Sequence, residues 1–131
     1  RHFSAQAIAN YPDVNSYKMP NTPKWTYNIG GTGTAFDDEK GRLQIRIDYG
    51  WRSGQFKEFS NYAALYQKSY GILNASATYR TPNKHIEGSV GVTNLTDKTY
   101  IVSGVYNSGI GYAQATISRP REWFLRLRYS Y

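Results

Sequence analysis

Residues 121–131 read Arg-Glu-Trp-Phe-Leu-Arg-Leu-Arg-Tyr-Ser-Tyr, and apolar and polar side chains alternate along this stretch. A strict period of two predicts a β-strand with one apolar face and one polar face. The apolar face has aromatic rings near both ends and leucines between them: Trp123, Leu125, Leu127, Tyr129 and Tyr131. That order, over about 9–11 residues, is typical of a strand that crosses a lipid bilayer. A strand in a soluble β-sandwich alternates in the same way, so this stretch alone fits both.

Residues 42–51 repeat the same design. One side carries Leu43, Ile45, Ile47, Tyr49 and Trp51, and the other carries two arginines, a glutamine and one aspartate. The outward face of strands in a soluble sandwich would rarely hold so many arginines beside so few acids. Two strands of this kind therefore favour a membrane barrel over a sandwich.

The composition indicates an all-β protein. The chain has 131 residues, enough for one domain, and 13 tyrosines favour strands while 12 glycines and 5 prolines favour turns. The mean hydropathy is −0.65 and no apolar run is long enough for a transmembrane helix. A membrane barrel fits these values, because polar residues that face its interior offset apolar residues that face lipid.

The charge and the absence of cysteine exclude some classes of function. There is no cysteine, so no disulfide and no thiolate metal site is expected. The net charge of +7 would suit a nucleic-acid partner, but the basic residues are scattered singly, which favours a solvated polar face. The chain starts at Arg1 without an initiator Met or a signal peptide, so we expect that it was processed or that an N-terminal part is missing.

The order of segments predicts an up-and-down, antiparallel barrel wall. About six strands are expected, at residues 1–10, 24–36, 42–51, 70–80, 85–94 and 121–131. Short turns at residues 37–41 and 81–84 alternate with long loops at residues 11–23, 52–69 and 95–120. Short turns at one end and long loops at the other are typical of outer-membrane barrels, whose short turns are periplasmic.

No constellation of residues predicts catalysis. The glycines of residues 30–33 lack the lysine of a phosphate loop and are expected to be strand glycines. Asp37 and Asp38 are expected in a charged turn, and His2 and His85 lack a nucleophile in a recognisable context. We therefore expect no enzyme, no catalytic residue, no metal and no cofactor.

Four segments resemble TonB-dependent outer-membrane receptors. Asn94-Leu95-Thr96-Asp97-Lys98-Thr99-Tyr100 resembles the N-L-x-D-K/R-x-Y segment near the end of those receptors, with Asn94, Leu95, Asp97 and Tyr100 at the motif positions. Pro120-Arg121 and the alternating strand behind them resemble the family's C-terminal strand. Residues 20–25 resemble the L-P-x-x-P-K/R segment that leads into an earlier strand, and residues 70–76 also fit. Together the four segments keep the order and spacing of the family.

The resemblance implies a 22-stranded barrel with an N-terminal plug domain inside it and a TonB-contacting segment before the plug. Residues 1–131 would then be the C-terminal part of the barrel, about its last quarter, with the plug absent from this chain. The implied partners are the outer-membrane bilayer of a Gram-negative bacterium, the rest of the barrel and plug, the TonB complex and a transported ligand. Tyr131, at the end of the terminal strand, resembles the signal that the barrel-assembly machinery recognises.

Two functions stay open at this point. The first is energy-coupled uptake of a scarce ligand such as an iron–siderophore complex, cobalamin or a glycan, with loop tyrosines as ligand contacts: Tyr62, Tyr66, Tyr106 and Tyr112. The sequence favours packing of the loops over ligand binding for these rings. The second is a free-standing soluble β-domain that binds polysaccharide or nucleic acid through Tyr/Trp and Arg/Lys. In that protein the rows of leucine and tryptophan would form a buried core.

Overall fold

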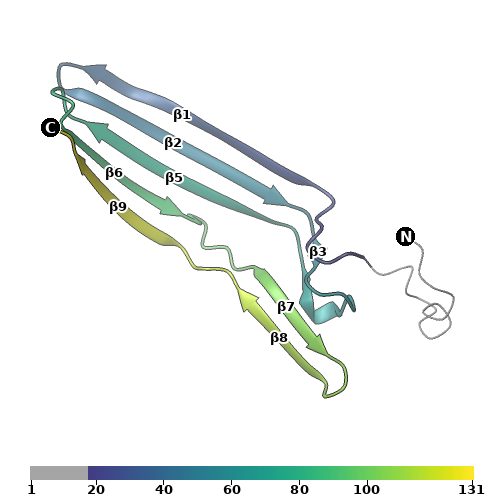
Figure 1. Cartoon of the computed structure of the whole chain (residues 1–131). Helices are drawn as coiled ribbons and strands as arrows, with labels where there is room; N and C mark the ends of the chain where they lie inside the picture. The colour runs from purple at the N-terminus through teal and green to yellow at the C-terminus, as the bar shows by residue number, and fades with distance from the viewer. Residues whose placement is uncertain (1–17) are drawn as a thin grey trace. The chain divides into compact units, whose positions relative to one another are not determined.

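The computed structural model describes residues 18–131, in which nearly all regular structure is antiparallel β. Five strands form one sheet in the order β1-β2-β5-β6-β9 (Figure 1). Their bounds are β1 Thr26–Asp38, β2 Gly41–Arg52, β5 Tyr70–Arg80, β6 Ile86–Thr93 and β9 Glu122–Tyr129. Five of the six predicted strands are confirmed. The sixth, at residues 1–10, and the start of the predicted loop 11–23 lie outside the described residues.

The chain divides into two compact units. The sheet unit comprises residues 25–52, 70–99 and 119–131, and the loop unit comprises the described residues 18–24 together with 53–69 and 100–118. Each unit draws on segments far apart in the sequence, so each needs long-range contacts to form.

The pairing of the sheet keeps apolar residues in register across the strands. Ile47 of β2 lies opposite Gly31 of β1 and Ala75 of β5, and Ala75 lies opposite Val92 of β6, which pairs with Trp123 of β9. Because side chains alternate along a strand, this register places all the apolar rows on one face and the charged rows on the other. The predicted division of β2 and β9 into two faces is therefore confirmed.

Two short turns join the strands at one end of the sheet. Between β1 and β2 the turn residues are Glu39 and Lys40, and the N–H of Lys40 donates to the Oδ1 of Asp38 at 2.8 Å. Gly41 follows at φ +114°, a conformation that L side chains rarely adopt. Residues 81–85 connect β5 to β6, and the N–H of Lys84 donates to the carbonyl of Thr81 at 2.9 Å.

A β-bulge changes which residue of β1 reaches the apolar face. The register shifts between Thr34 and Phe36, so that Phe36 lies opposite Leu43 and Ala35 is left out of the pairing. The bulge brings the ring of Phe36 to 6.4 Å from the ring of Tyr79, on the same face.

The predicted loops 52–69 and 95–120 contain regular structure that the sequence did not predict. In the first, β3 (Gln55–Phe56) pairs with β4 (Tyr66–Gln67), and a 3-10 turn, η2, spans Ala63–Leu65. In the second, β7 (Ile101–Asn107) and β8 (Tyr112–Ile117) form a hairpin. The interpretation of residues 101–117 as loop is wrong, because glycines, serines and a register shift after Ile101 break the alternation that normally identifies a strand.

Candidate functional site

The apolar face of the sheet is exposed. The β9 residues Trp123, Leu125, Leu127 and Tyr129 leave between 69% and 74% of their surface accessible, and Ile47 of β2 leaves 52%. No element of the described sheet unit covers this face with a second layer of apolar side chains. A soluble sandwich would bury these rows as its core, and it would not leave such a large continuous patch in water.

Aromatic residues lie at both ends of the apolar face. At the long-loop end, the rings of Tyr27 and Trp51 lie 5.6 Å apart, and at the short-turn end Phe36 packs beside Tyr79. Phe36 follows Tyr27 by about nine positions, which is about 30 Å of strand at the usual rise per residue. A tilt of about 40° reduces this length to about 23 Å, close to the apolar band of a membrane barrel. The face therefore has the length and the interfacial rings of a lipid-facing wall.

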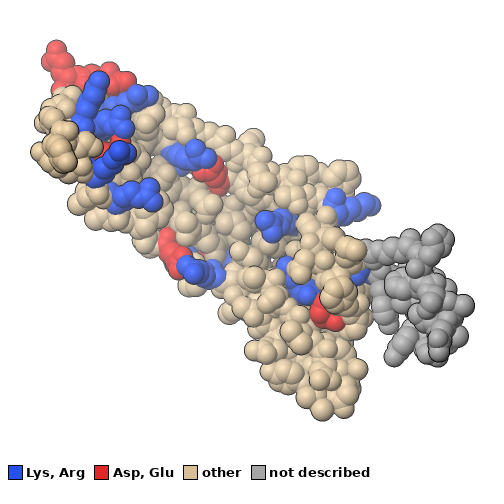
Figure 2. All heavy atoms as spheres, in the orientation of Figure 1, with Lys and Arg blue, Asp and Glu red and all other residues tan. Residues whose placement is uncertain are grey.

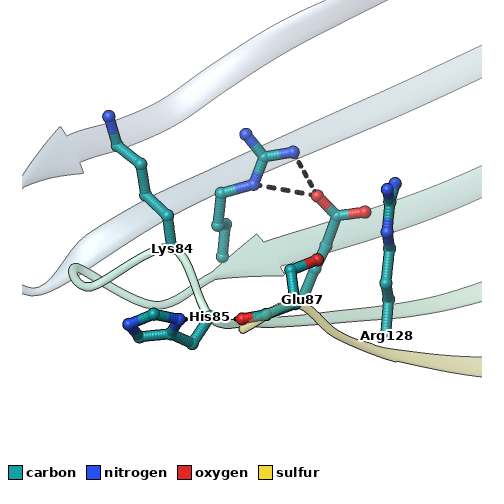
Figure 3. Close-up of a pocket in the computed structure, with 6 residues that line it drawn as sticks. Lys84, His85, Glu87 and Arg128 are labelled. Atoms are coloured by element: carbon teal, nitrogen blue, oxygen red, sulfur yellow. Dashed lines mark hydrogen bonds and ion pairs between the residues drawn. The ribbon is translucent and has the colours of Figure 1, made fainter.

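The opposite face is charged and hydrogen-bonded. Arg46 donates two hydrogen bonds to the carboxylate of Asp48, at 2.7 and 2.8 Å, and Arg80 pairs with Glu87. The side chain of Asp48 lies over Gly30, where an added Cβ would overlap the carboxylate. Figure 2 shows basic and acidic side chains gathered together at one end of the sheet, and further groups of opposite charge side by side nearer the middle of the view, and Figure 3 shows the bonds between Arg80 and Glu87. A wall that is apolar outside and polar inside can enclose an aqueous or protein-filled interior.

Asn94 connects the end of β6 to the start of β9. It is 6% exposed and has φ +52°, and its side-chain amide donates to the carbonyls of Lys98 (3.0 Å) and Arg119 (3.3 Å). Its Oδ1 accepts the N–H of Lys98 at 2.8 Å. The backbone N–H of Asn94 also donates to the side chain of Asn74 on β5 at 2.9 Å. One buried side chain thus fixes both ends of the 95–120 segment to the sheet.

The other motif residues extend this connection. Leu95 donates its N–H to the carbonyl of Leu73 at 2.8 Å, and Asp97, at φ +50°, accepts the N–H of Arg121 at 2.8 Å. Tyr100 belongs to the loop unit, where its carbonyl accepts the N–H of Ser118 at 2.8 Å. The motif that suggested the family from sequence is therefore a set of backbone anchors at the base of a loop.

The four candidate tyrosines all lie in the loop unit, and the structure brings two of them together. The rings of Tyr62 and Tyr106 stack at 4.1 Å with an interplanar angle of 3°. Tyr66 packs against Phe56 at 4.9 Å, and the hydroxyl of Tyr112 donates to Gln114 at 3.1 Å. Tyr62, Tyr66 and Tyr106 thus pack against other rings, and Tyr62, Tyr66 and Tyr112 keep part of their surface exposed.

A carboxylate fixes the segment that carries Tyr62. Glu58 accepts the backbone N–H groups of Tyr62 (2.6 Å) and Ser60 (2.7 Å) and the hydroxyl of Ser60 (2.8 Å). Partial burial pushes the pKa of Glu58 upward, but these three hydrogen bonds outweigh burial and hold the pKa below its usual range. Asn61 completes the turn at φ +56° and exchanges hydrogen bonds with the backbone of Lys18 at 2.6 and 2.8 Å.

The sequence missed a small core in the loop unit. Leu65 is 2% exposed, and an added Cβ on Gly104 of β7 would contact it, so the hairpin packs closely on η2. Three polar side chains are also buried nearby in the chain: Gln55, Lys57 and Gln67. Gln67 accepts the N–H of Ile101 at 2.6 Å, which joins β4 to β7. Buried polar residues in short irregular strands carry no periodic signal, and no pattern in the sequence identifies them.

No helix among residues 18–131 is long and apolar enough to cross a membrane. In the same residues, no group of three or more His, Cys, Asp or Glu side chains is arranged to hold a metal ion.

Comparisons with known proteins agree with this geometry. The family model described as TonB dependent receptor-like, beta-barrel, matches residues 3–95. The ferric yersiniabactin uptake receptor FyuA from Yersinia pestis is a similar solved structure, with a TM-score of 0.72 and 24% identity over 84% of this chain. This chain spans 16% of the length of FyuA. No curated protein matches the chain.

Proteins of the matched family are outer-membrane transporters that act with TonB, and they are not enzymes. The family model covers most of the chain, and the fold agrees with it independently. The resemblance that the motifs indicated is confirmed: this chain belongs to the TonB-dependent receptor-like β-barrel family.

Proposed function

We propose that residues 1–131 are the C-terminal part of a 22-stranded barrel whose receptor imports a scarce ligand by TonB-coupled transport. The observation that carries the proposal is the division of the sheet: exposed leucine and tryptophan rows on one face and ion-paired charges on the other. The first face matches lipid and the second matches a polar interior. The plug domain, the remaining strands and the TonB-contacting segment belong to the rest of the receptor.

An iron–siderophore complex is the first ligand class to test, before cobalamin and glycans. The similar solved structure, FyuA, is a ferric yersiniabactin uptake receptor. The described part of the loop unit carries Lys18, Lys24, Lys57 and Lys68 against a single acid, Glu58, so its charge suits an anionic complex. Its stacked tyrosines would add flat contact area for aromatic groups of the ligand.

The ligand contact of this chain is assigned to the exposed surface of the Tyr62–Tyr106 pair, with Tyr66 and Tyr112 as secondary contacts. The parallel rings are held before any ligand arrives, because Glu58 fixes the turn that carries Tyr62 and the β7–β8 hairpin fixes Tyr106. A pre-organised aromatic surface loses little conformational entropy on binding.

The experiment measures binding and uptake in the full receptor with a ferric siderophore panel, cobalamin and oligosaccharides. Tyr62→Ala with Tyr106→Ala should weaken binding of the transported ligand by about threefold to tenfold, the usual value of an aromatic contact. Tyr62→Phe with Tyr106→Phe keeps the rings and serves as the control. Uptake of none of the three classes would refute the transport function, and equal affinity of the alanine and phenylalanine variants would refute the ligand contact.

The same chain is assigned a role in assembly. The outward rings of Tyr129 and Tyr131 end the terminal strand and would present the signal recognised by the barrel-assembly machinery. Deletion of Tyr131 from the full receptor should lower its level in the outer membrane. Normal levels after deletion would leave Tyr131 with no role beyond anchoring at the membrane interface.

A further inference from the structure

The two long loops of the loop unit meet along a short side-chain interface. One segment, residues 62–67, contains η2 and β4, and the other, residues 101–106, belongs to β7. The contacts are, in order, Tyr62 with Tyr106, Leu65 with Gly104 and Gln67 with Ile101. The two segments therefore lie alongside each other with opposite chain directions, although no backbone ladder joins them.

The backbone does not require glycine at position 104. Gly104 pairs with Ala115 in the β7–β8 ladder and does not have a positive φ, whereas Gly111 of the same hairpin has φ +64°. An added Cβ at Gly104 would lie 2.9, 3.1 and 3.2 Å from three side-chain carbons of Leu65. Carbon atoms in contact prefer about 3.5–4.0 Å, so the missing side chain is what allows Leu65 to approach β7.

Leu65 is held where it meets Gly104. Its side chain is 2% exposed, and its carbonyl accepts the N–H of Lys57 at 3.2 Å. Its own N–H donates to the carbonyl of Tyr62 at 2.9 Å and closes the turn of η2. Leu65 and Tyr62 therefore form one stiff piece, and a shift of Leu65 also moves Tyr62.

Gly104 and Tyr106 form the second stiff piece. They lie two residues apart on β7, on the same side of the strand, and both are paired with β8. The hydrogen bonds of Glu58 stay within the first loop and the β7–β8 ladder stays within the second, so neither sets the distance between the loops. That distance depends on the close contact of Leu65 with bare backbone at Gly104.

We propose that Gly104 is a positioning residue of the ligand contact: by admitting Leu65 against β7, it holds the ring of Tyr62 parallel to the ring of Tyr106. The proposal rests on the proposed function, because the paired rings are the assigned contact. It adds the residue that sets their spacing, and Gly104 itself needs no contact with the ligand. A methyl group at this position would push Leu65 back by about 0.5–1 Å and would displace Tyr62 from its parallel stack.

The test moves one methylene group across the contact in the full receptor. Gly104→Ala adds the group, and Gly104→Ala with Leu65→Val removes an equal volume from the other side, so the total volume is kept. Gly109→Ala is the matched control, because it adds the same group to the same hairpin and meets only the Oδ1 of Asn107, at 3.3 Å.

The readout is photo-oxidative coupling of the two tyrosines, which needs no ligand. A photo-excited ruthenium complex removes one electron from each ring, and persulfate accepts the two electrons. Each ring also loses one proton, and a carbon–carbon bond joins the two rings where they are in contact. Mass spectrometry of the peptides should show the bond between Tyr62 and Tyr106 in the native receptor and in Gly109→Ala. The yield should be severalfold lower in Gly104→Ala and should recover in the double variant.

Equal yields in the native receptor and Gly104→Ala would overturn the proposal. So would a loss that Leu65→Val does not restore, an equal loss in Gly109→Ala, or absence of the bond from the native receptor.

Binding of the ferric siderophores, cobalamin and oligosaccharides is measured on the same samples. Affinity for the compound that the native receptor binds should fall about twofold to fivefold in Gly104→Ala. It should fall no further when Gly104→Ala is added to Tyr62→Ala with Tyr106→Ala, because the rings through which Gly104 acts are then absent. A further fall would overturn the positioning role. Coupling as expected with none of these compounds bound would refute the proposed function and not the spacing of the rings.

Discussion

The sheet unit and the loop unit are both β structure, but different contacts hold them together. In the sheet, backbone ladders join five long strands, and large apolar side chains such as Ile47, Trp123 and Leu125 stay exposed. In the loop unit the strands are short, and they surround a small core around Leu65, which is 2% exposed. The more regular unit buries Tyr70 and Val92 and yet leaves whole rows of large apolar side chains exposed.

This difference shows where each unit obtains its stability. Apolar surface contributes about 25 cal/mol per Å² when it leaves water, so the exposed rows of the sheet gain that energy only when lipid covers them. The loop unit buries its own apolar and polar groups and has side-chain hydrogen bonds of its own, such as those of Glu58 and Asn61. We therefore expect the sheet to depend on the bilayer and the loop unit to depend on sequence-specific packing.

The largest expected effect is a charge placed on the lipid side of the sheet. Ile47→Arg should destabilise the full receptor in vesicles by about 2–4 kcal/mol, because Ile47 lies midway between the aromatic ends of the face and a charge at the middle of the bilayer is costly. Gln44→Arg is the control on the inward face of the same strand, where the row neighbours Thr34 and Thr78 are neutral. Its expected effect is within about 0.5 kcal/mol. The measurement is the free energy of unfolding from vesicles in denaturant.

The two substitutions also decide which face is outside. If Gln44→Arg were the costly change and Ile47→Arg the harmless one, the assignment of lipid to the leucine and tryptophan rows would be reversed. Equal effects would mean that neither face contacts lipid, as in the soluble alternative.

The sequence predicted the sheet well for a physical reason. In β2 and β9 every second residue had to be apolar, because one face of each strand meets lipid and the other does not. The predicted range 70–80 matches β5, and the ranges 42–51 and 85–94 differ from β2 and β6 by one residue at each end. Where β1 departs from alternation, at the bulge between Thr34 and Phe36, the sequence did not predict the register shift.

The candidate site was less predictable. The motif at Asn94 was visible as a family resemblance, but its role as a connection depends on Arg119, which lies 25 residues away in the sequence. The stacking of Tyr62 on Tyr106 joins two segments even further apart. Such long-range contacts leave no local pattern, so the family resemblance identified the loop tyrosines as candidates and could not show which of them meet.

Loss of the Asn94 side chain should have the next largest effect. Asn94→Ala leaves the backbone groups of Lys98 and Arg119 without their buried partner and puts a less tolerant residue at φ +52°. Together these changes should cost about 2–3 kcal/mol. Amide exchange at Lys98 should accelerate, and Asn94→Gly, which relieves only the backbone, should restore part of the loss. Unchanged exchange in Asn94→Ala would show that the motif does not anchor the loop.

Substitutions at two glycines of the sheet should change the stability by smaller amounts, and the two changes should differ. An added Cβ at Gly91 of β6 would overlap the ring of Phe124, whereas at Gly31 of β1 nothing lies within 4 Å. Gly91→Val should therefore destabilise the receptor by about 1–3 kcal/mol through overpacking, and Gly31→Val should be neutral or slightly stabilising. Thermal unfolding of the two variants in the same lipid provides the comparison. Equal melting temperatures would show that Phe124 moves aside without cost.

The smallest expected effect is a pH response confined to the loop unit. Glu58 has a lowered pKa in the folded loop, so its hydrogen bonds stabilise the loop fully above the unfolded pKa of about 4.3. This contribution is lost as the pH falls through the lower, folded pKa, because the protonated carboxyl accepts these bonds poorly. Amide exchange at Ser60 and Tyr62 should then accelerate relative to a Glu58→Gln variant measured at each pH, while amides of β2 and β5 show no such difference. Equal loss of protection in β2 and β5 would mean that acid opens both units together. The expectation that the loop unit and the sheet unit are stabilised separately would then be wrong.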